Sequence, residues 1–494
     1  MKQTTFLTLA GCLALGLLGC EADVSDDQPR VHIEYQTRVD GDGLNYVFAE
    51  GTLSGTVQHG GSYTVPVQIY YPTEGGNGTA ILEPTNSVLL FFLLASRGDI
   101  AGDHRSDADN IDELEKMQVN FGLAGAKEYL LRNGYTHMAI QHSKTVTDFM
   151  GETPPAGRDR RHLCYGRIER ATDGYAIVRD AARWLRNTDA LTGDAPPLRA
   201  YDHVIAYGLS GSGYFLRSYL SRGENEGQEI DGFFVHAAGS MNLDLIDDTA
   251  DCPENSRCIG SPRFSNWFLS EGPPPADGAK VLAVDAQSDL EFNAGALARQ
   301  NDDTADSDYV RWEVAGAPHV PVFALDMTGL GAVHQNTMDW SSIWRSGFDY
   351  LDRWVKEGTP PPPGPFIQGQ MVDTEKGPAW KPELDGDGNA LGGIRLPEIE
   401  APLGVYTGFD FSWLEPAVAE NYPYAFVFAY GGRFDPFSDE ELAKRYPDEV
   451  AYRDAFAAAA RTAFEGGYIL EEDLRRYADR PLELPHFRSA DEGE

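Results

Sequence analysis

Hydrophobic and polar positions follow two different periods along the chain. Residues 31–72 alternate with a period of two between glycine turns, which predicts an antiparallel start to a sheet. Beyond them, short apolar runs alternate with stretches of helical period. The apolar runs predict strands at 87–96, 135–143, 201–208, 230–239, 280–287 and 309–316. The stretches of helical period predict helices at 111–134, 173–188 and 342–358. Such alternation is typical of an α/β fold with a mostly parallel sheet and helices on both faces.

Two segments interrupt this rhythm, and a further region follows it. Residues 143–170 and 240–278 are polar insertions after predicted strands, where substrate-binding caps are commonly placed. After the stretch "GTPPPPGP", residues 366–415 are predicted to be irregular and 436–482 to be helical. We therefore expect a sheet domain over residues 31–360 and a C-terminal extension over 361–494 that packs on it.

Composition narrows the classes of partner. The 494 residues are 42% hydrophobic and 11% aromatic, as expected of a globular protein with a large core. The formal net charge of −37 argues against nucleic acid or an anionic lipid surface as a partner, because phosphate binding requires a basic face. A small molecule is the expected partner, and the charge itself is explained by solubility or by attraction of cationic substrates.

The N-terminal residues predict an export signal. One lysine and a short apolar run end in "LLGC", which resembles the lipobox of bacterial lipoproteins, with Cys20 as the lipidated residue. "LAGC", ending at Cys12, also fits but leaves a shorter apolar stretch, and an ordinary secretory signal is the alternative. We expect residues 1–20 to form a lipoprotein signal peptide, with lipid attached at Cys20. Residues 21–30 are expected to tether the protein to the cell envelope. Retention of a Cys20→Ser variant in the membrane fraction would exclude this anchor.

Three further cysteines would lie in a disulfide-permissive compartment. Cys252 and Cys258 enclose a small loop and are the expected disulfide, which leaves Cys164 free or buried. No Cys-His spacing in the sequence indicates a zinc site, and neither a metal nor another cofactor is expected.

Small residues crowd one predicted strand-to-helix turn, "AYGLSGSGYFLR" at 206–217. In the nucleophile elbow of the α/β-hydrolase fold, a serine at such a turn is flanked by small residues two positions before and after it. Gly208 and Ser212 flank Ser210 in this way, whereas Tyr214 would occupy the second small position if Ser212 were the nucleophile. The motif is therefore GxSxS rather than GxSxG, and it favours Ser210.

A serine nucleophile needs a histidine base and a carboxylate that orients the base, in the order Ser, acid, His in this fold. Asp289 follows the predicted strand 280–287, and His319 follows the strand 309–316. The acid could instead be Asp285 or Glu291. For the base, His334, His236 and His142 are alternatives by residue type but combine order and strand-end position less well.

Oxyanion donors are expected from two backbone N–H groups. The first is that of Gly211, directly after the serine at a helix N-terminus. The second is expected after the strand 87–96, from Arg97 or Ser96. The Arg97 side chain could alternatively bind a substrate carboxylate or pair with Asp99.

Several longer motifs resemble a bacterial family of alpha/beta hydrolase domain-containing proteins. "GLSGSGYFLR" and "RWEVAGAPHV" are similar to its serine and histidine motifs, with Gly211 and Tyr214 departing from the family pattern. "LDRWVKEGTPPPP", "DGNALGGIRLPEIEAPLGVYTG" and "PFSDEELAKRYP" extend the resemblance over residues 85–480. It implies an α/β-hydrolase fold and serine hydrolase activity, but no particular substrate. The "DGDGN" stretch (Asp385, Asp387, Asn389) has calcium-loop spacing but lacks the glycine and glutamate of an EF-hand, which favours a turn.

These residues support three hypotheses about function. The first is a serine esterase that acts through an acyl-enzyme, with Ser210, His319 and Asp289 as its triad. The second is an amidase or peptidase with the same triad, and the third is a lipid-anchored binding protein on a hydrolase fold without activity. The presence of all three residue types in order argues against the third.

Overall fold

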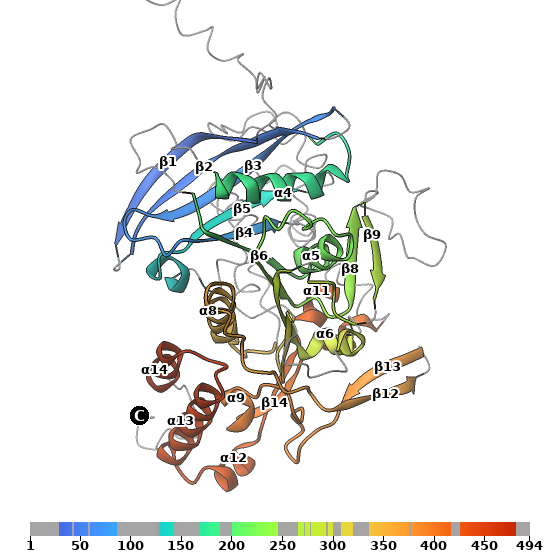
Figure 1. The fold of residues 1–494 in the computed structure, drawn as a ribbon. Helices are drawn as coiled ribbons and strands as arrows, with labels where there is room; N and C mark the ends of the chain where they lie inside the picture. Colours follow the sequence, from blue (N-terminus) through green and yellow to red (C-terminus); the bar gives the residue numbers. More distant parts are fainter. Residues whose placement is uncertain are drawn as a thin grey trace, which may run out of the picture.

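A nine-stranded sheet organises the fold of the computed structural model, with strand order β1-β2-β3-β5-β4-β6-β7-β10-β11 (Figure 1). The structure describes residues 29–85 without 42–43 and 58–59, 126–142 without 127, 168–187, 200–245, 265–292 without 271 and 277, 295–299, 308–319, 335–415 without 375–376, and 425–480. The predicted insertion 143–170 lies almost entirely outside these ranges, as do Cys20, Cys164, Cys252, Cys258 and Arg97.

The first strands are long and antiparallel, as the alternating pattern predicts. β1 (Arg30–Gly41) pairs with β2 (Leu44–Thr56), and β2 with β3 (Ser62–Pro72). In β3, buried and partly exposed residues alternate at the start and give way to a fully buried stretch near its end. The change occurs at Val67, where the pairing of β3 with β5 (Thr136–Gln141) begins; β5 is buried throughout.

The remaining pairings in this sheet are parallel. They join β4 (Thr79–Thr85), β5, β6 (His203–Leu209), β7 (Gly232–His236), β10 (Lys280–Ala286) and β11 (Tyr309–Val314). Because parallel strands share one direction, the loops that follow them meet at one edge of the sheet. The prediction of a mostly parallel sheet is therefore confirmed.

One strand of the sheet, β4, was not predicted from the sequence. The predicted strand 87–96 lies outside the described residues, and the place between β5 and β6 is taken by β4, which ends just before it. β4 reads "TAILEPT", with Glu83 and Pro84 near its end. The apolar run in β4 is short, whereas residues 87–96 form a long apolar run. The hydrophobic pattern alone therefore favours a strand at 87–96.

Helices cover both faces of the parallel strands, and alternate residues of each strand face different cores. On one face, α4 (Asp173–Arg186) and α5 (Gly211–Ser221) pack on Val204, Ala206 and Phe233. On the other face, α8 (Ser341–Glu357) packs on Ile205, Tyr207 and Phe234. Burial of both faces explains why β6 and β7 are apolar apart from one histidine at an end of each. Within the second predicted insertion, β8 (Met241–Leu245) and β9 (Ser265–Leu269) form a hairpin.

The C-terminal extension continues the architecture at the β11 edge. Ile394 forms a parallel bridge with Val314, and the backbone of Ala315 donates to the carbonyl of Ile394 at 3.0 Å. In the final helices, Asp473 of α14 (Glu471–Asp479) accepts a 2.7 Å hydrogen bond from Arg345 of α8. Figure 1 shows these helices gathered below the sheet. The extension therefore contacts both the edge and one helical layer of the sheet domain.

The extension contains more regular structure than the sequence predicted. Residues 366–415, expected to be irregular, contain four short strands or α-helices and a 3-10 helix, η3 (Phe411–Leu414). Helices occupy most of 436–480, as expected. The strands and α-helices within 366–415 are β12 (Gly369–Thr374), β13 (Gly377–Pro382), α9 (Pro397–Glu400) and β14 (Gly404–Thr407). The elements that follow are α11 (Ala425–Tyr430), β15 (Arg433–Pro436), α12 (Asp439–Arg445) and α13 (Glu449–Glu465). β13 contains one glycine and two prolines, which weakens its strand signal. Within the described ranges, no helix has the length and apolar character required to cross a bilayer.

Candidate active site

Ser210 lies at a strained turn between β6 and α5. Its φ of 56° and ψ of −122° fall in a region that L-residues with a side chain rarely adopt. The backbone N–H of Ser210 donates to the carbonyl of His236 on β7 at 2.9 Å, and its own carbonyl accepts from Tyr214 N–H at 2.8 Å. The turn is thus fixed at both ends, as the elbow prediction requires.

Close backbone approach explains the small residues around Ser210. A Cβ atom on Gly208 would lie 2.6 Å from the backbone carbon and oxygen of Ser212. Gly213, which the sequence analysis did not single out, is under the same constraint, since its Cβ would lie 2.8 Å from the carbonyl oxygen of His236. Both distances are shorter than non-bonded contacts allow. The first turn of α5 can therefore pack on β6 and β7 only with glycine at these two positions.

The structure brings Ser210, His319 and Asp289 into one hydrogen-bonded chain. The Nε2 atom of His319 lies 2.7 Å from Ser210 Oγ, and its Nδ1 atom lies 2.6 Å from Asp289 Oδ1. With the proton on Nδ1, the imidazole donates to Asp289 and leaves Nε2 to accept the serine proton. Asp289 is fully buried and His319 is 5% exposed. This arrangement has the geometry needed for nucleophilic catalysis by serine.

Asp289 is held by the element that carries it, α6 (Gln287–Glu291). Its Oδ2 atom accepts a 2.8 Å hydrogen bond from the backbone N–H of Ala286, so that Oδ1 is turned toward the histidine. The alternative acid Asp285 faces elsewhere: it accepts from Gly239 N–H at 2.6 Å and lies 2.7 Å from Arg311 Nη2. Asp285 therefore belongs to a buried ion pair within the sheet.

Two buried amide side chains fix the loop that carries His319. Gln287 accepts a 2.8 Å hydrogen bond from the backbone N–H of Gly316, and Asn336 donates to the carbonyl of Gly316 at 2.8 Å. Asn336 also donates to Thr407 in the C-terminal extension at 3.2 Å. The sequence analysis did not identify either residue, because an amide has no spacing signature that marks such a role.

The alternative histidines occupy other positions. His236 is the last residue of β7, with its Nδ1 atom 3.0 Å from the hydroxyl of Tyr207 and its ring edge-on to those of Trp340 and Trp344. Burial, with His319 nearby, holds the pKa of His236 well below its usual range, so this imidazole is neutral. His142 follows β5 and packs against the ring of Phe215, while His334 lies outside the described residues.

Of the two predicted oxyanion donors, only the N–H group of Gly211 lies within the described residues. Gly211 is the first residue of α5, at the helix N-terminus beside Ser210, where partial positive charge favours an anion. Arg97 and Ser96 lie outside the described residues. The structure therefore places one of the two predicted donors.

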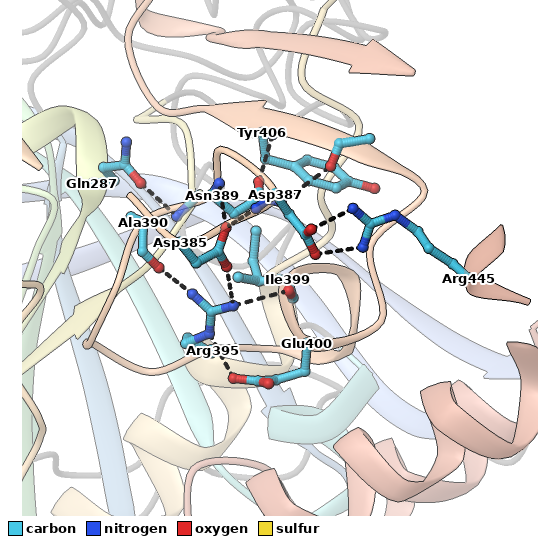
Figure 2. Close-up of polar contacts among 12 residues, drawn as sticks. Gln287, Asp385, Asp387, Asn389, Ala390, Arg395, Ile399, Glu400, Tyr406 and Arg445 are labelled. Carbon is cyan, nitrogen blue, oxygen red and sulfur yellow. Dashed lines mark hydrogen bonds and ion pairs between the residues drawn. The ribbon is translucent and has the colours of Figure 1, made fainter. Parts of the chain in front are cut away.

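The "DGDGN" stretch forms a turn that is tied down by arginines (Figure 2). Asp385 accepts hydrogen bonds from the backbone N–H groups of Asp387 and Asn389, each at 2.9 Å, and pairs with Arg395 at 2.8 Å. Both carboxylate oxygens of Asp387 contact Arg445. Because the carboxylate oxygens of Asp385 and Asp387 already bind groups of the protein, these contacts favour a turn over a calcium loop. Across the described residues, no group of three or more His, Cys, Asp or Glu side chains could hold a metal ion.

Glu291, on the same short helix as Asp289, predicts a pH-dependent stability. Burial raises the pKa of its carboxyl to about 7, although Gln287 donates a 3.0 Å hydrogen bond to it. Since the unfolded-state pKa is about 4.5, the folded protein binds the extra proton between these values. The resulting stabilisation is complete below pH 4.5 and is lost as the pH rises to about 7. The loss is expected to reach roughly 3 kcal/mol.

A Glu291→Gln variant should not show this loss, because glutamine cannot ionise. Thermal unfolding from pH 4 to pH 9 should show similar stability of variant and wild type at pH 4 and a more stable variant above pH 7. Glu357→Gln, at the exposed end of α8, is the matched control and should follow the wild type. A constant difference between Glu291→Gln and wild type at every pH would contradict the assignment.

Sheet order, strained serine turn and the Ser-His-Asp chain define the class of fold as that of the alpha/beta hydrolases. A family model described as "Alpha/beta hydrolase domain" matches residues 109–479. The chain belongs to this family, as the sequence motifs predicted. The match extends into the C-terminal extension, as far as the end of α14.

Similarity to individual solved structures is low. A CE15 glucuronoyl esterase from Teredinibacter turnerae is 10% identical, with 43% of this chain and 46% of that chain covered and a TM-score of 0.25. A CE15 esterase from a marine bacterial metagenome is 12% identical over 54% and 70% of the two chains, with a TM-score of 0.28. Candida antarctica lipase A is 11% identical over 42% and 41%, with a TM-score of 0.22. No curated protein sequence matches the chain.

Proposed function

We propose that this protein is a serine hydrolase that cleaves carboxylic esters through an acyl-enzyme. The observation that carries the proposal is the hydrogen-bonded chain from Ser210 Oγ through His319 to Asp289. The chain starts at a turn whose strained backbone is typical of functional sites and is not needed in a simple connection.

In the proposed reaction, Ser210 Oγ attacks the ester carbonyl carbon while His319 Nε2 accepts the hydroxyl proton. The carbonyl oxygen becomes an oxyanion, to which we assign the N–H of Gly211 as one donor. Collapse of this intermediate breaks the carbon–oxygen bond to the alcohol, and His319 returns the proton to the departing oxygen. Water then attacks the acyl-enzyme by the same steps, which releases the acid and restores Ser210.

Asp289 supports this cycle without exchanging a proton. Its Oδ1 atom holds the Nδ1–H tautomer of His319, and its negative charge stabilises the imidazolium that forms when the serine proton is transferred. Complete burial of the carboxylate strengthens that interaction, because water does not screen it.

Labelling with a fluorophosphonate probe, combined with turnover of matched ester and amide substrates, tests the proposal. We expect one covalent adduct, mapped by mass spectrometry to Ser210, and hydrolysis of p-nitrophenyl acetate faster than of the corresponding anilide. Faster anilide hydrolysis would identify an amidase or peptidase. An unlabelled protein without turnover of either substrate would overturn the proposal in favour of a binding protein.

A further inference from the structure

A tyrosine of the C-terminal extension packs against the histidine of the candidate active site. The ring centroids of Tyr430 and His319 are 4.3 Å apart, and their planes are inclined by 47°. Tyr430 is the last residue of α11 and is 6% exposed, so the contact is buried. A residue from a segment beyond the sheet domain is therefore in contact with one of the three candidate triad residues.

The extension reaches this position through a close backbone approach. Gly408 follows β14, and a Cβ atom there would lie 2.7 Å from the backbone nitrogen of Ser288 and 3.0 Å from the carbonyl oxygen of Ala317. Ser288 precedes Asp289, and Ala317 lies two residues before His319. Gly408 therefore lies between the loops that carry the acid and the base.

Local hydrogen bonds and ring contacts then fix Tyr430. The backbone N–H of Asp410 donates to the carbonyl of Ala429 at 2.9 Å, which ties α11 to the segment that starts at Gly408. The Tyr430 ring also meets Phe409 and Phe292 edge-on, at centroid distances of 5.2 Å and 5.3 Å. With neighbours on these sides, the tyrosine ring is held against the imidazole.

We propose that Tyr430 is a positioning residue that acts through His319. Its ring keeps the imidazole in line between Asp289 and Ser210, and it stabilises the imidazolium formed when His319 accepts the serine proton. The 4.3 Å separation lies within the ~6 Å over which a cation is attracted to an aromatic ring. Neutral imidazole gains less from this attraction, so the benefit is largest in the transition state. The inference rests on the proposed serine hydrolase mechanism.

The charged and titratable groups around His319 come from three packed elements. Asp289 faces Nδ1 from α6, Tyr430 faces the ring from α11, and neutral His236 on β7 interacts with it electrostatically. Asp289 and the Tyr430 ring both stabilise a positive charge on the imidazole, and the neutral His236 does not oppose it. Removal of the Tyr430 ring should therefore weaken the stabilisation of the imidazolium.

The test compares Tyr430→Leu with Tyr430→Phe, using the rate of fluorophosphonate labelling and kcat and KM for p-nitrophenyl acetate. We expect Tyr430→Leu to lower the labelling rate and kcat roughly tenfold or more with little change in KM. The acid-side midpoint of the rate profile should move to lower pH. Tyr430→Phe keeps the ring and should restore both properties to near wild-type values.

A matched control separates this role from simple packing. Tyr452 on α13 is also buried and is not part of the site. Its ring meets Tyr446 edge-on and Phe456 at a tilt, with centroid distances of 5.0 Å and 5.7 Å. Tyr452→Leu should lower thermal stability without moving the acid-side midpoint. If Tyr430→Leu fails to fold, fluorinated phenylalanines at position 430 keep the ring shape while weakening its attraction for cations. The midpoint should then fall with each added fluorine.

The outcomes distinguish this inference from the proposed function. A wild-type protein that is neither labelled nor active would refute the hydrolase mechanism itself. An active wild type with an unchanged acid-side midpoint in Tyr430→Leu, or in the fluorinated series, would overturn the role of Tyr430 alone. The same conclusion would follow if Tyr430→Phe were as impaired as Tyr430→Leu.

Discussion

Replacement of Ser210 by alanine is expected to abolish fluorophosphonate labelling and to lower ester hydrolysis by about 10⁴- to 10⁶-fold. The hydroxyl oxygen lies 2.7 Å from His319 Nε2, and alanine has no atom that could form the acyl-enzyme in its place. The fold should persist, because alanine is smaller than serine and the backbone contacts to His236 and Tyr214 do not involve the side chain. Circular dichroism and thermal unfolding would verify that the loss is chemical.

Ser212 provides the matched control for that experiment. It lies in the same turn and is 8% exposed, but it belongs to the first turn of α5, where its backbone packs against Gly208. Ser212→Ala should therefore retain labelling and most activity. If Ser212→Ala were inactive and Ser210→Ala active, the assignment of the nucleophile within the turn would be wrong.

The second large effect is expected for Asp289→Asn, which should lower kcat by about 10⁴-fold. Asparagine can present its amide N–H₂ group to His319 Nδ1, which favours the tautomer with the proton on Nε2. That tautomer cannot accept the proton of Ser210. The charge that stabilises the imidazolium is lost as well. A pH profile of kcat in the variant, with rates measured by p-nitrophenyl acetate hydrolysis, would quantify both losses.

Glu291→Gln separates this effect from a general disturbance of α6. Glu291 is on the same helix, and the side chain of Gln287 donates to it, but its carboxylate lies outside the chain from Ser210 to Asp289. The variant should keep kcat within a few-fold of wild type while changing the pH dependence of unfolding. Equal losses of kcat in Asp289→Asn and Glu291→Gln would be incompatible with Asp289 as the orienting acid.

The parts of the site that the sequence predicted are those with local signatures. Ser210 is recognisable because a sharp turn requires small neighbours, and Gly208 meets that requirement through a backbone contact that leaves no room for a Cβ. Asp289 and His319 are recognisable because each follows a buried strand in the order that the fold imposes. Neighbouring parallel strands then bring the two loops to one edge of the sheet.

The parts that the sequence did not predict depend on contacts between distant segments. Tyr430 lies near neither the serine nor the histidine in sequence, and aromatic residues at the end of a short helix are ordinary core residues. Gly408 looks like any turn glycine until its approach to Ser288 and Ala317 is known. Strand β4 was missed for a related reason: its place in the middle of the sheet is set by pairing with β5 and β6.

The position of Gly408 and Tyr430 also affects how the protein is made. The ribosome synthesises the chain from its N-terminus. Ser210, Asp289 and His319 are therefore made well before Gly408 and Tyr430, which pack on the acid and base loops. Domains generally fold as units during synthesis, and a unit that lacks its last segment holds an incomplete set of contacts. A nascent chain stopped before residue 408 carries Ser210, Asp289 and His319 but lacks the contacts that Gly408 and Tyr430 make with Ser288, Ala317 and His319. These contacts can therefore form only after residues 408–430 have been synthesised.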